Sequence, residues 1–483
     1  MGRLAEETAR LARLVASAGG RAWLVGGAVR DGLLAADFDA AAIPRSLDAC
    51  KDADVEVFGL DAATLRETVA ARYAFDECGV SFGVLKLKGV PIDVSMPRRE
   101  SKLSPGHKGF AVDSDPRMSV AEAASRRDFT VNAIYFDPLG GAIADPFGGA
   151  DDLRNGILRH VSPKFAEDPL RVLRGMQFTA RFGLEPAPET IALCSTMGLE
   201  GLARERIMEE WSKLLLRGRR ISKGLEFLRA TGWTRHFPEL ERLIGCKQDP
   251  LWHPEGDVWN HTLAVMDAFA AQRTGDDAED LVVGFAALCH DFGKPATTRF
   301  DPSDGHIRSR GHDEAGVEPT LSFLRRFTAE ERLLREVPPL VRCHMRPFAM
   351  YKSKSGDNAV RRLAAQVGRI DRLVRVCRAD AQGAGAPGGH PELEWLEERA
   401  EALRVADSAP KPILLGRHLL SMGLKPSPMF GKWLAACYDA QLDGRFADLD
   451  GAVEWFKKTR SGLVVDGAEQ PVHGNGLALA PQD

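Results

Sequence analysis

The chain has 483 residues, of which 44% are apolar, a size that predicts about three domains and a composition typical of a globular protein with a sizeable core. Its net charge of −4 excludes a protein that binds nucleic acid over its whole surface, so an RNA-binding surface must be local. No apolar run reaches the ~18 residues of a membrane span, and the eight Cys include no C-x-x-C pair. We therefore expect a cytoplasmic protein with reduced thiols, no disulfide framework and no structural zinc.

The first segment with a chemical signature is residues 21–31, which predict a short strand, a Gly-Gly turn and the start of a helix. Gly26 and Gly27 let backbone N–H groups approach a phosphate closely, because they carry no Cβ. The helix N-terminus adds a favourable dipole, and Arg30 adds positive charge. This stretch therefore predicts a phosphate-binding site.

The next predicted strand, residues 52–58, alternates acidic with apolar residues, the period of a half-buried strand. The alternation places Asp52, Asp54 and Glu56 on one face. Three carboxylates repel each other unless a cation lies among them, and Mg²⁺ binds carboxylate oxygens together with substrate phosphates. The pattern indicates a two-metal site for phosphoryl or nucleotidyl transfer. A solvated edge strand with its acidic residues outward is the alternative.

A second D-x-D lies in the preceding segment, residues 36–50, where it consists of Asp37 and Asp39. Asp39 is followed by Ala-Ala-Ala-Ile-Pro, which is not a strand pattern, whereas Asp54 is followed by Val-Glu-Val-Phe. We therefore predict Asp52 and Asp54 as the catalytic pair. The role of the 36–50 segment is left open.

Two further strands complete the predicted sheet, at residues 82–89 and 90–94. Asp93 lies on the second of them and is the candidate for a third carboxylate near the metals, with an exposed strand-end Asp as the alternative. Residues 96–125 are rich in Gly, Pro, Ser and charge, so they predict a flexible loop. A mobile basic loop beside the site can help to clamp a substrate, although a solvated connection has the same composition.

The motif R-R-D-F-T-V-N-A follows at residues 126–133. Arg127 can neutralise phosphate charge, and Asp128 can bind a sugar or orient that Arg. Asn132 is predicted to contact the ribose. Without its context, a run of R-R-D indicates surface charge.

Residues 167–174 predict the start of a helix, because Pro169 suits a first turn. Asp168 and Arg171 are three residues apart and so share a helix face. Arg supplies only donors and ionised Asp only acceptors, so the pair can bind the pairing edge of cytosine or adenine, while guanine and uracil fit worse. A helix-surface ion pair is the alternative. Arg174 closes the run and is predicted to bind nucleotide as well.

Together these motifs resemble a known family. The pattern L-V-G-G-x-V-R-D…K-D-x-D is similar to the head of class II tRNA nucleotidyltransferases and bacterial poly(A) polymerases, within the polymerase-β superfamily. The R-R-D-F-T-x-N-A and E-D-x-x-R motifs follow in the same order. The resemblance implies nucleotide addition to an RNA 3′ end without a nucleic-acid template, with Mg²⁺ at Asp52 and Asp54, and with Asp168 and Arg171 selecting CTP and ATP. The chain departs from the family at residues 33–35, where Leu-Leu-Ala replaces Leu-Leu-Gly.

A second constellation of His and Asp residues lies between residues 253 and 380. Its order, a His, then His-Asp, then a distal Asp, resembles the HD phosphohydrolases, which implies phosphodiesterase and phosphatase activity. Such ligands suit Mn²⁺, Ni²⁺, Fe or Co rather than a structural zinc, with Mg²⁺ as an alternative. Lys294 is predicted to stabilise phosphate charge, and His312 and His344 to hold a second ion or the substrate phosphate. The predicted metal ligands are His261, His290, Asp291 and Asp380.

The predicted fold class is α+β, with a head of mixed sheet and helices over residues 1–150 followed by all-α regions. Residues 151–244 form the predicted neck, which carries the nucleotide-recognition helix, and residues 245–385 form the HD domain. Residues 386–483 resemble the helical, tRNA-contacting C-terminal part of such enzymes. Residues 461–483 show no periodicity and are expected to be disordered.

The resemblance as a whole implies an enzyme that adds the 3′-terminal CCA to tRNA from CTP and ATP. Two alternatives stay open. A poly(A) polymerase, or an enzyme that adds only CC or only A, has the same head motifs. An HD phosphohydrolase with a non-catalytic RNA-binding head would use only the second site. The intact Gly-Gly, D-x-D and E-D-x-x-R motifs favour an active head, while the oligomeric state is left open.

Overall fold

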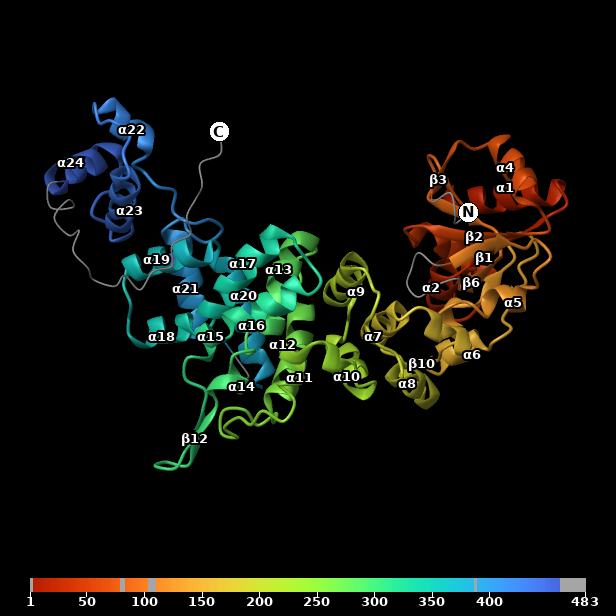
Figure 1. Ribbon diagram of the computed structural model, residues 1–483, viewed down its shortest axis with the longest axis horizontal. Coiled ribbons are helices and arrows are strands. Elements are labelled where there is room, and N and C mark those ends of the chain that lie inside the picture. The colour runs from red at the N-terminus through yellow and green to blue at the C-terminus, as the bar shows by residue number, and fades with distance from the viewer. Residues whose placement is uncertain (1–2, 79–82, 103–109, 386–388, 461–483) are drawn as a thin grey trace. The chain divides into compact units, whose positions relative to one another are not determined.

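The computed structural model describes residues 3–78, 83–102, 110–385 and 389–460 (Figure 1). The chain forms two compact units. The first is made of Met1–Val337 and Ala379–Ala386, and the second of Pro338–Arg378 and Pro387–Asp483. Within the described ranges, no helix is long and apolar enough to cross a membrane.

The head of the first unit is built on a seven-stranded mixed sheet, which confirms the predicted fold class. Its strands are β1 (Arg21–Val25), β2 (Ala53–Phe58), β3 (Phe75–Cys78), β4 (Val84–Leu87), β5 (Ile92–Ser95), β8 (Tyr135–Phe136) and β9 (Ile143–Ala144). They are ordered β3-β4-β5-β2-β1-β8-β9, and only β2 and β5 run parallel. Helix α1 (Arg3–Ser17) packs on β1 with its apolar face, which includes Leu4 and Leu11.

Strand β2 is more deeply buried than its alternation predicts. Every residue of β2 except Asp54 is buried, so the expected half-buried strand is wrong. One reason is that β2 is a central strand, flanked by β1 and β5. The other is that Glu56 has partners inside the head. The Tyr135 hydroxyl donates to Glu56 Oε2 at 2.6 Å, and the Arg127 guanidinium lies 3.5 Å from the same oxygen. Glu56 therefore does not share an open acidic face with Asp54.

In the described parts of the 96–125 segment, residues 96–102 and 110–125, the structure differs from the flexible loop that the composition predicts. These parts contain a pair of antiparallel strands and a short helix, and residues 103–109 lie outside the described ranges. The prediction is wrong because strand pairing satisfies backbone groups whatever the side chains are. In addition, the helix starts at a capping box of Ser119 and Glu122, and the polar residues around this pair make its pattern hard to recognise in the sequence. The elements are β6 (Arg98–Lys102), β7 (Phe110–Ser114) and α5 (Val120–Ala124).

The 36–50 segment folds into three short helical turns that pack beside α2 (Gly27–Ala35). Ile43 is fully buried there. The second D-x-D is used locally, because Asp39 accepts a hydrogen bond from the backbone N–H of Ala41 and so caps a turn. The turns are η1 (Ala40–Ala42), α3 (Ile43–Ser46) and η2 (Leu47–Ala49).

Helices build most of the remainder of the first unit. The neck helices are α6 (Gly149–Arg154), α7 (Leu170–Phe182), α8 (Pro188–Ser195), α9 (Arg204–Arg217), α10 (Ile221–Ala230) and α11 (Pro238–Glu241). The HD segment contains α12 (Val258–Ala271), α13 (Asp277–Cys289), α14 (Lys294–Thr297), the hairpin β12 (Arg299–Asp301) and β13 (His306–Arg308), α15 (His312–Ala315) and α16 (Val317–Arg325). An aromatic core joins neck and HD helices, because the Trp211 ring of α9 packs edge-on against Phe237 and Phe323, with centroids 5.2 and 5.4 Å away.

Two long helices, α17 (Glu331–Cys343) and α20 (Ile370–Gly383), contribute residues to both units. The second unit also contains α18 (Arg346–Lys352), α19 (Asp357–Val367), α21 (Pro391–Ala402), α22 (Gly416–Ser421), α23 (Met429–Leu442) and α24 (Leu449–Thr459). A small core around Trp433, Phe446 and Phe456 holds its last helices together. The predicted disorder of residues 461–483 concerns a segment outside the described ranges.

Candidate functional site

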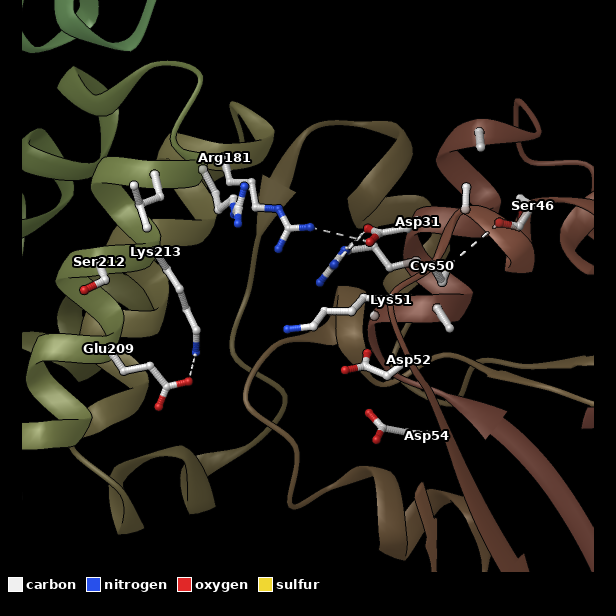
Figure 2. Close-up of a pocket in the computed structure, with 17 residues that line it drawn as sticks. Asp31, Ser46, Cys50, Lys51, Asp52, Asp54, Arg181, Glu209, Ser212 and Lys213 are labelled. Carbon is white, nitrogen blue, oxygen red and sulfur yellow. Dashed lines mark hydrogen bonds and ion pairs between the residues drawn. The ribbon is translucent and has the colours of Figure 1, made fainter. Parts of the chain in front are cut away.

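A pocket of about 830 Å³ in the first unit lies between the head and the neck. Figure 2 shows Lys51, Asp52 and Asp54 on the head side and Glu209, Ser212 and Lys213 on α9 at the opposite side. Gly27 and Arg30 of α2 also line it, as does Arg181 of α7. The structure thus brings the Gly-Gly turn and the predicted catalytic pair to one cavity.

The acidic residues of the pocket are crowded. Asp54 lies on β2 directly beside Asp93 on the parallel strand β5, and Asp52 comes one residue before β2. Although Asp54 is the exposed residue of β2, the protein around its carboxylate displaces part of the water and raises its pKa, and the charges of Asp52 and Asp93 raise it further, while Arg127 opposes them. Lys86 Nζ lies 3.2 Å from Asp93 Oδ2. Carboxylates this close together fit a divalent cation, which would offset their mutual repulsion.

The Gly-Gly turn is shaped for close approach. Gly26 has φ of +79°, a conformation that L side chains rarely adopt, and it precedes the first residue of α2. A Cβ at Gly26 would lie 3.3 Å from Asp54 Oδ2. The turn therefore places the N-terminus of α2 next to the predicted catalytic pair, where the N–H groups of its first turn suit a phosphate.

Arg30 lines the pocket, but its guanidinium is largely used inside the protein. Its side chain is buried, and Nη1 donates to Asn132 Oδ1 at 2.5 Å while Nε donates to Asp31 Oδ1 at 2.8 Å. The guanidinium also lies 4.2 Å from the centre of the Phe182 ring. These contacts connect α2 with Asn132 of the R-R-D-F-T-V-N-A motif and with Phe182 of α7.

The R-R-D motif forms a buried network rather than a row of free ligands. Asp128 accepts from Asn132 Nδ2 at 3.0 Å and from Arg174 Nε at 2.7 Å. The Arg that Asp128 orients is therefore Arg174, whereas Arg127 pairs with Glu56. Burial alone would raise the pKa of Asp128, but Arg174 and the hydrogen bonds lower it to about 2. None of these four side chains, Arg127, Asp128, Asn132 and Arg174, is among the described residues that line the pocket.

Asp168 and Arg171 do not share a helix face as predicted. Helix α7 starts only at Leu170, and Asp168 is extended before it and accepts from the Leu170 N–H at 3.1 Å. Arg206 of α9 donates to Asp168 Oδ2 at 2.8 Å. Arg171 instead donates to two backbone carbonyls, at 2.8 and 2.7 Å. The prediction of a shared face is wrong because Pro169 precedes the helix instead of lying in its first turn.

The second constellation comes together in the HD segment. His261 Nε2, on α12, lies 3.0 Å from Asp380 Oδ1, on α20, and 3.3 Å from His290 Nε2. His290 Nε2 is also 3.2 Å from Asp291 Oδ2. These residues are far apart in the sequence, yet all four predicted ligands converge on one buried point. Imidazole nitrogens and carboxylate oxygens at this separation fit a divalent cation.

Charges around this point favour the ionised carboxylate. Burial alone would raise the pKa of Asp291, but His290 and Lys294 hold it well below its usual range. Lys294 Nζ lies 2.8 Å from Asp291 Oδ2, and His312 Nε2 lies 3.5 Å from Oδ1. His344 belongs to the second unit, in which its Nδ1 contacts the Val341 carbonyl oxygen at 2.6 Å. Lys294 is thus already next to a predicted ligand.

Comparison with known proteins agrees with both constellations. Residues 22–159 match the Poly A polymerase head domain and residues 258–407 the HD domain. The multifunctional CCA protein of Nitrosococcus oceani is 35% identical over 417 residues, which cover 83% of this chain and 93% of that protein. The one of Xanthomonas campestris pv. campestris is 34% identical over 407 residues, covering 80% and 92%. The chain belongs to the multifunctional CCA protein family.

Solved structures share the fold of this family member. The CCA-adding enzyme of Bacillus stearothermophilus in complex with CTP matches with a TM-score of 0.63 at 22% identity, covering 96% of this chain and 99% of that one. The CCA-adding enzyme of Thermotoga maritima complexed with tRNA matches with a TM-score of 0.55 at 19% identity, covering 94% and 95%. Both likenesses agree with the α+β head and the helical remainder.

In this multifunctional CCA protein family member, sequence reasoning missed several residues near the two sites. Arg206, the partner of Asp168, lies 38 residues away on another helix, and no local pattern links the two. Lys51 directly precedes Asp52 in the sequence, but no role was predicted for it, and only the structure places it in the pocket lining. Glu255 stands two residues after His253, and its Oε1 lies 2.7 Å from Nδ1 of His261. The spacing H-P-E-x₅-H was the available signal.

Proposed function

We propose that the chain is a template-independent RNA nucleotidyltransferase that adds or repairs the 3′-terminal CCA of tRNA from CTP and ATP. One observation carries the proposal: the structure brings the Gly-Gly turn, Asp52 and Asp54 to one pocket in a chain 35% identical to a multifunctional CCA protein. We assign this reaction to the head of residues 1–150 and the neck of residues 151–244. The C-terminal region, residues 386–483, is proposed to contact tRNA.

In the proposed head reaction, Asp52 and Asp54 hold Mg²⁺, with Asp93 beside them. Bound Mg²⁺ would lower the pKa of the attacking 3′-hydroxyl and neutralise the leaving phosphates. The backbone N–H groups after Gly26 bind the triphosphate, and Lys51 adds an ammonium on the same side of the pocket. Transfer from a triphosphate needs no protein nucleophile, because the RNA hydroxyl attacks the α-phosphate directly.

Asp168 and Arg171 are proposed to select the base. Arg206 keeps Asp168 ionised, since burial alone would raise the pKa of Asp168 while Arg206 lowers it. Oδ1 of Asp168 accepts from the Leu170 N–H and from Arg206 Nη1, whereas Oδ2 accepts from Arg206 Nη2 at 2.8 Å. The second lone pair of Oδ2 can therefore accept from the exocyclic amine of cytosine or adenine without releasing Arg206. Arg171 must exchange a carbonyl partner for the base. The assignment of both residues to one base is supported by their closeness, because the charge of Arg171 also lowers the pKa of Asp168.

The HD segment, residues 245–385, is proposed to be a metal-dependent phosphodiesterase or phosphatase. His261, His290, Asp291 and Asp380 would hold a transition metal such as Ni²⁺, Mn²⁺, Fe or Co, or else Mg²⁺. The bound ion would supply Lewis-acid polarisation of a phosphoryl oxygen. Lys294 balances the buried charge of Asp291, and His312 lies on the other side of that carboxylate, where it can donate to a phosphate oxygen.

The test uses a tRNA transcript without its 3′ CCA, incubated with Mg²⁺ and CTP, ATP or both, and read at single-nucleotide resolution. We expect three added residues with both nucleotides, ending in A. Two residues or one would mark a partial-addition enzyme, and a long A tail a poly(A) polymerase. Absence of extension under every condition would contradict the transferase proposal and leave function to the HD segment. Asp52→Ala should abolish extension and retain phosphatase activity, which separates the two sites.

A further inference from the structure

The carboxylate of Glu255 contacts two imidazole rings at the edge of the HD metal site. Its Oε1 lies 2.7 Å from Nδ1 of His261 and 2.8 Å from Nδ1 of His253. The His261 ring is fully buried, and its other nitrogen, Nε2, points to Asp380 Oδ1 at 3.0 Å. The two nitrogens of His261 therefore serve different partners, and Glu255 occupies the one that faces away from the predicted metal.

This arrangement determines which nitrogen of His261 is available as a ligand. A carboxylate only accepts hydrogen bonds, so it selects the form in which Nδ1 carries the proton. With the proton on Nδ1, the lone pair of Nε2 is free for a cation. Glu255 also fixes the plane of the His261 ring. If the buried ring turned, Nδ1 would lose its contact with Glu255, and little water is present to replace that partner.

We propose that Glu255 is a positioning residue of the HD centre, which orients His261 so that Nε2 faces the metal. The inference rests on the metal site proposed above and adds a residue that does not touch the ion. Carboxylates behind ligating imidazoles raise metal affinity by fixing the tautomer and by making the ring more basic, and their loss lowers affinity about 10- to 100-fold.

His253 provides a matched control within the same contact. It shares Oε1 of Glu255 with His261, and its side chain is part-exposed where His261 is fully buried. His253→Ala removes one partner of Glu255 and leaves the contact with His261 in place. A role of Glu255 through His261 therefore predicts different results for Glu255→Ala and His253→Ala.

The experiment measures Co²⁺ affinity of the full chain by calorimetric titration, with every variant built on Asp54→Ala to weaken binding in the head. Glu255→Ala should lower Co²⁺ affinity about 10- to 100-fold. His253→Ala and Glu241→Ala, a charge control at an exposed residue of α11, should retain the affinity of the parent. His261→Ala should lose the site. Circular dichroism melting checks that each variant is folded.

The outcomes separate the two proposals. Unchanged Co²⁺ affinity in a folded Glu255→Ala, with a loss in His261→Ala, would overturn the inference alone. Unchanged affinity in both would overturn the metal site itself. An equal loss in His253→Ala would also overturn the inference, because the effect would not run through His261.

If Glu255→Ala does not fold, ¹⁵N-histidine NMR of the Zn²⁺-loaded Asp54→Ala parent tests the inference by showing which nitrogen of His261 binds the metal. A protonated Nδ1 and a metal-bound Nε2 on His261 are expected. A metal-bound Nδ1 would contradict the inference.

Discussion

Identical carboxyl groups behave differently in this protein because their neighbours differ. Asp54 lies among other carboxylates, and partial loss of water around its carboxylate together with their charge raises its pKa. Asp128 lies between donors, and Arg174 and the hydrogen bonds lower its pKa to about 2 although burial opposes them. The first group is thus unstable without a cation, and the second is a fixed structural anion. Both occur in acidic motifs that look alike in the sequence.

The first prediction concerns the folding stability that the protein loses through repulsion among the carboxylates around Asp54. A carboxyl whose folded pKa is raised favours folding at low pH and disfavours it as pH rises through the folded pKa. Asp54→Asn should therefore raise the melting temperature of the Mg²⁺-free chain at pH 8, by about 2 °C for each kcal/mol of repulsion removed. The same variant should lose nucleotide addition by on the order of a hundredfold or more.

Differential scanning calorimetry in EDTA and the extension assay check this prediction. Asp39→Asn is the matched control, because Asp39 belongs to the second D-x-D and only caps a turn. It should keep nucleotide addition. A loss of addition in Asp39→Asn with retention in Asp54→Asn would reverse the choice of catalytic pair.

The second prediction concerns the buried pair of Asp128 and Arg174. Asp128→Ala leaves the Arg174 guanidinium and Asn132 without their acceptor, which should cost about 3–5 kcal/mol. The folded pKa of about 2 lies below the ordinary 3.8, so this stability is present above 3.8 and is lost as pH falls through about 2. Urea unfolding at pH 7 and pH 3 measures it. Asp151→Ala, which breaks an exposed pair with Arg154, should change stability by less than about 0.5 kcal/mol.

At the scale of elements, neighbours decide how a helix or strand is used. The alternation of β2 is that of a surface strand, yet its central place in the sheet buries all but Asp54. Helix α7 shows the same dependence. It packs closely on α10, and a Cβ at Gly175 would lie 2.6 Å from the Phe227 ring. The helix thus depends on the absence of a side chain at one position.

The third prediction follows from that contact. Gly175→Ala gains up to about 1 kcal/mol of helix propensity but forces the Phe227 ring or the helix to move, which costs about 1–3 kcal/mol. We expect net destabilisation in urea unfolding monitored by tryptophan fluorescence. Gly431→Ala is the matched control, since Gly431 lies in α23 and nothing is within 4 Å of its added Cβ. It should stabilise the chain slightly, and a stabilising Gly175→Ala would contradict the packing argument.

At the scale of the whole molecule, two sites with different donor sets lie in one chain. Among the residues that the structure describes, the predicted ligands of the head are the carboxylates of Asp52, Asp54 and Asp93, whereas the HD site adds the imidazoles of His261 and His290. Hard Mg²⁺ prefers oxygen, while imidazole suits transition ions. The two sites should therefore differ in the metal that serves them.

The fourth prediction uses that difference. After EDTA treatment and dialysis, Mg²⁺ alone should restore nucleotide addition to the full chain. Hydrolysis of a phosphomonoester such as p-nitrophenyl phosphate should return strongly only with Ni²⁺, Co²⁺ or Mn²⁺. Parallel assays across these ions check it, with His261→Ala as the control that retains addition. Equal recovery of both activities with Mg²⁺ alone would contradict separate metal preferences.

The sequence by itself determined the fold class, the family and the residues that converge. Local periodicity predicts strands and helices, and motifs such as G-G, D-x-D and H…HD…D name chemical groups that need one another. Asp52 with Asp54, and His261 with His290, were therefore identifiable before any coordinates, and they stay predictions until their chemistry is measured. Only the tertiary structure decided which side chains form hydrogen bonds and ion pairs with each other. Arg206 on Asp168, Arg174 on Asp128 and Glu56 on Tyr135 join residues at least 38 positions apart, and no local pattern carries such distances. Burial depends on the neighbouring elements, which is why β2 differs from expectation. The 96–125 strands differ because backbone pairing formed them, and the start of α7 differs because Pro169 precedes the helix.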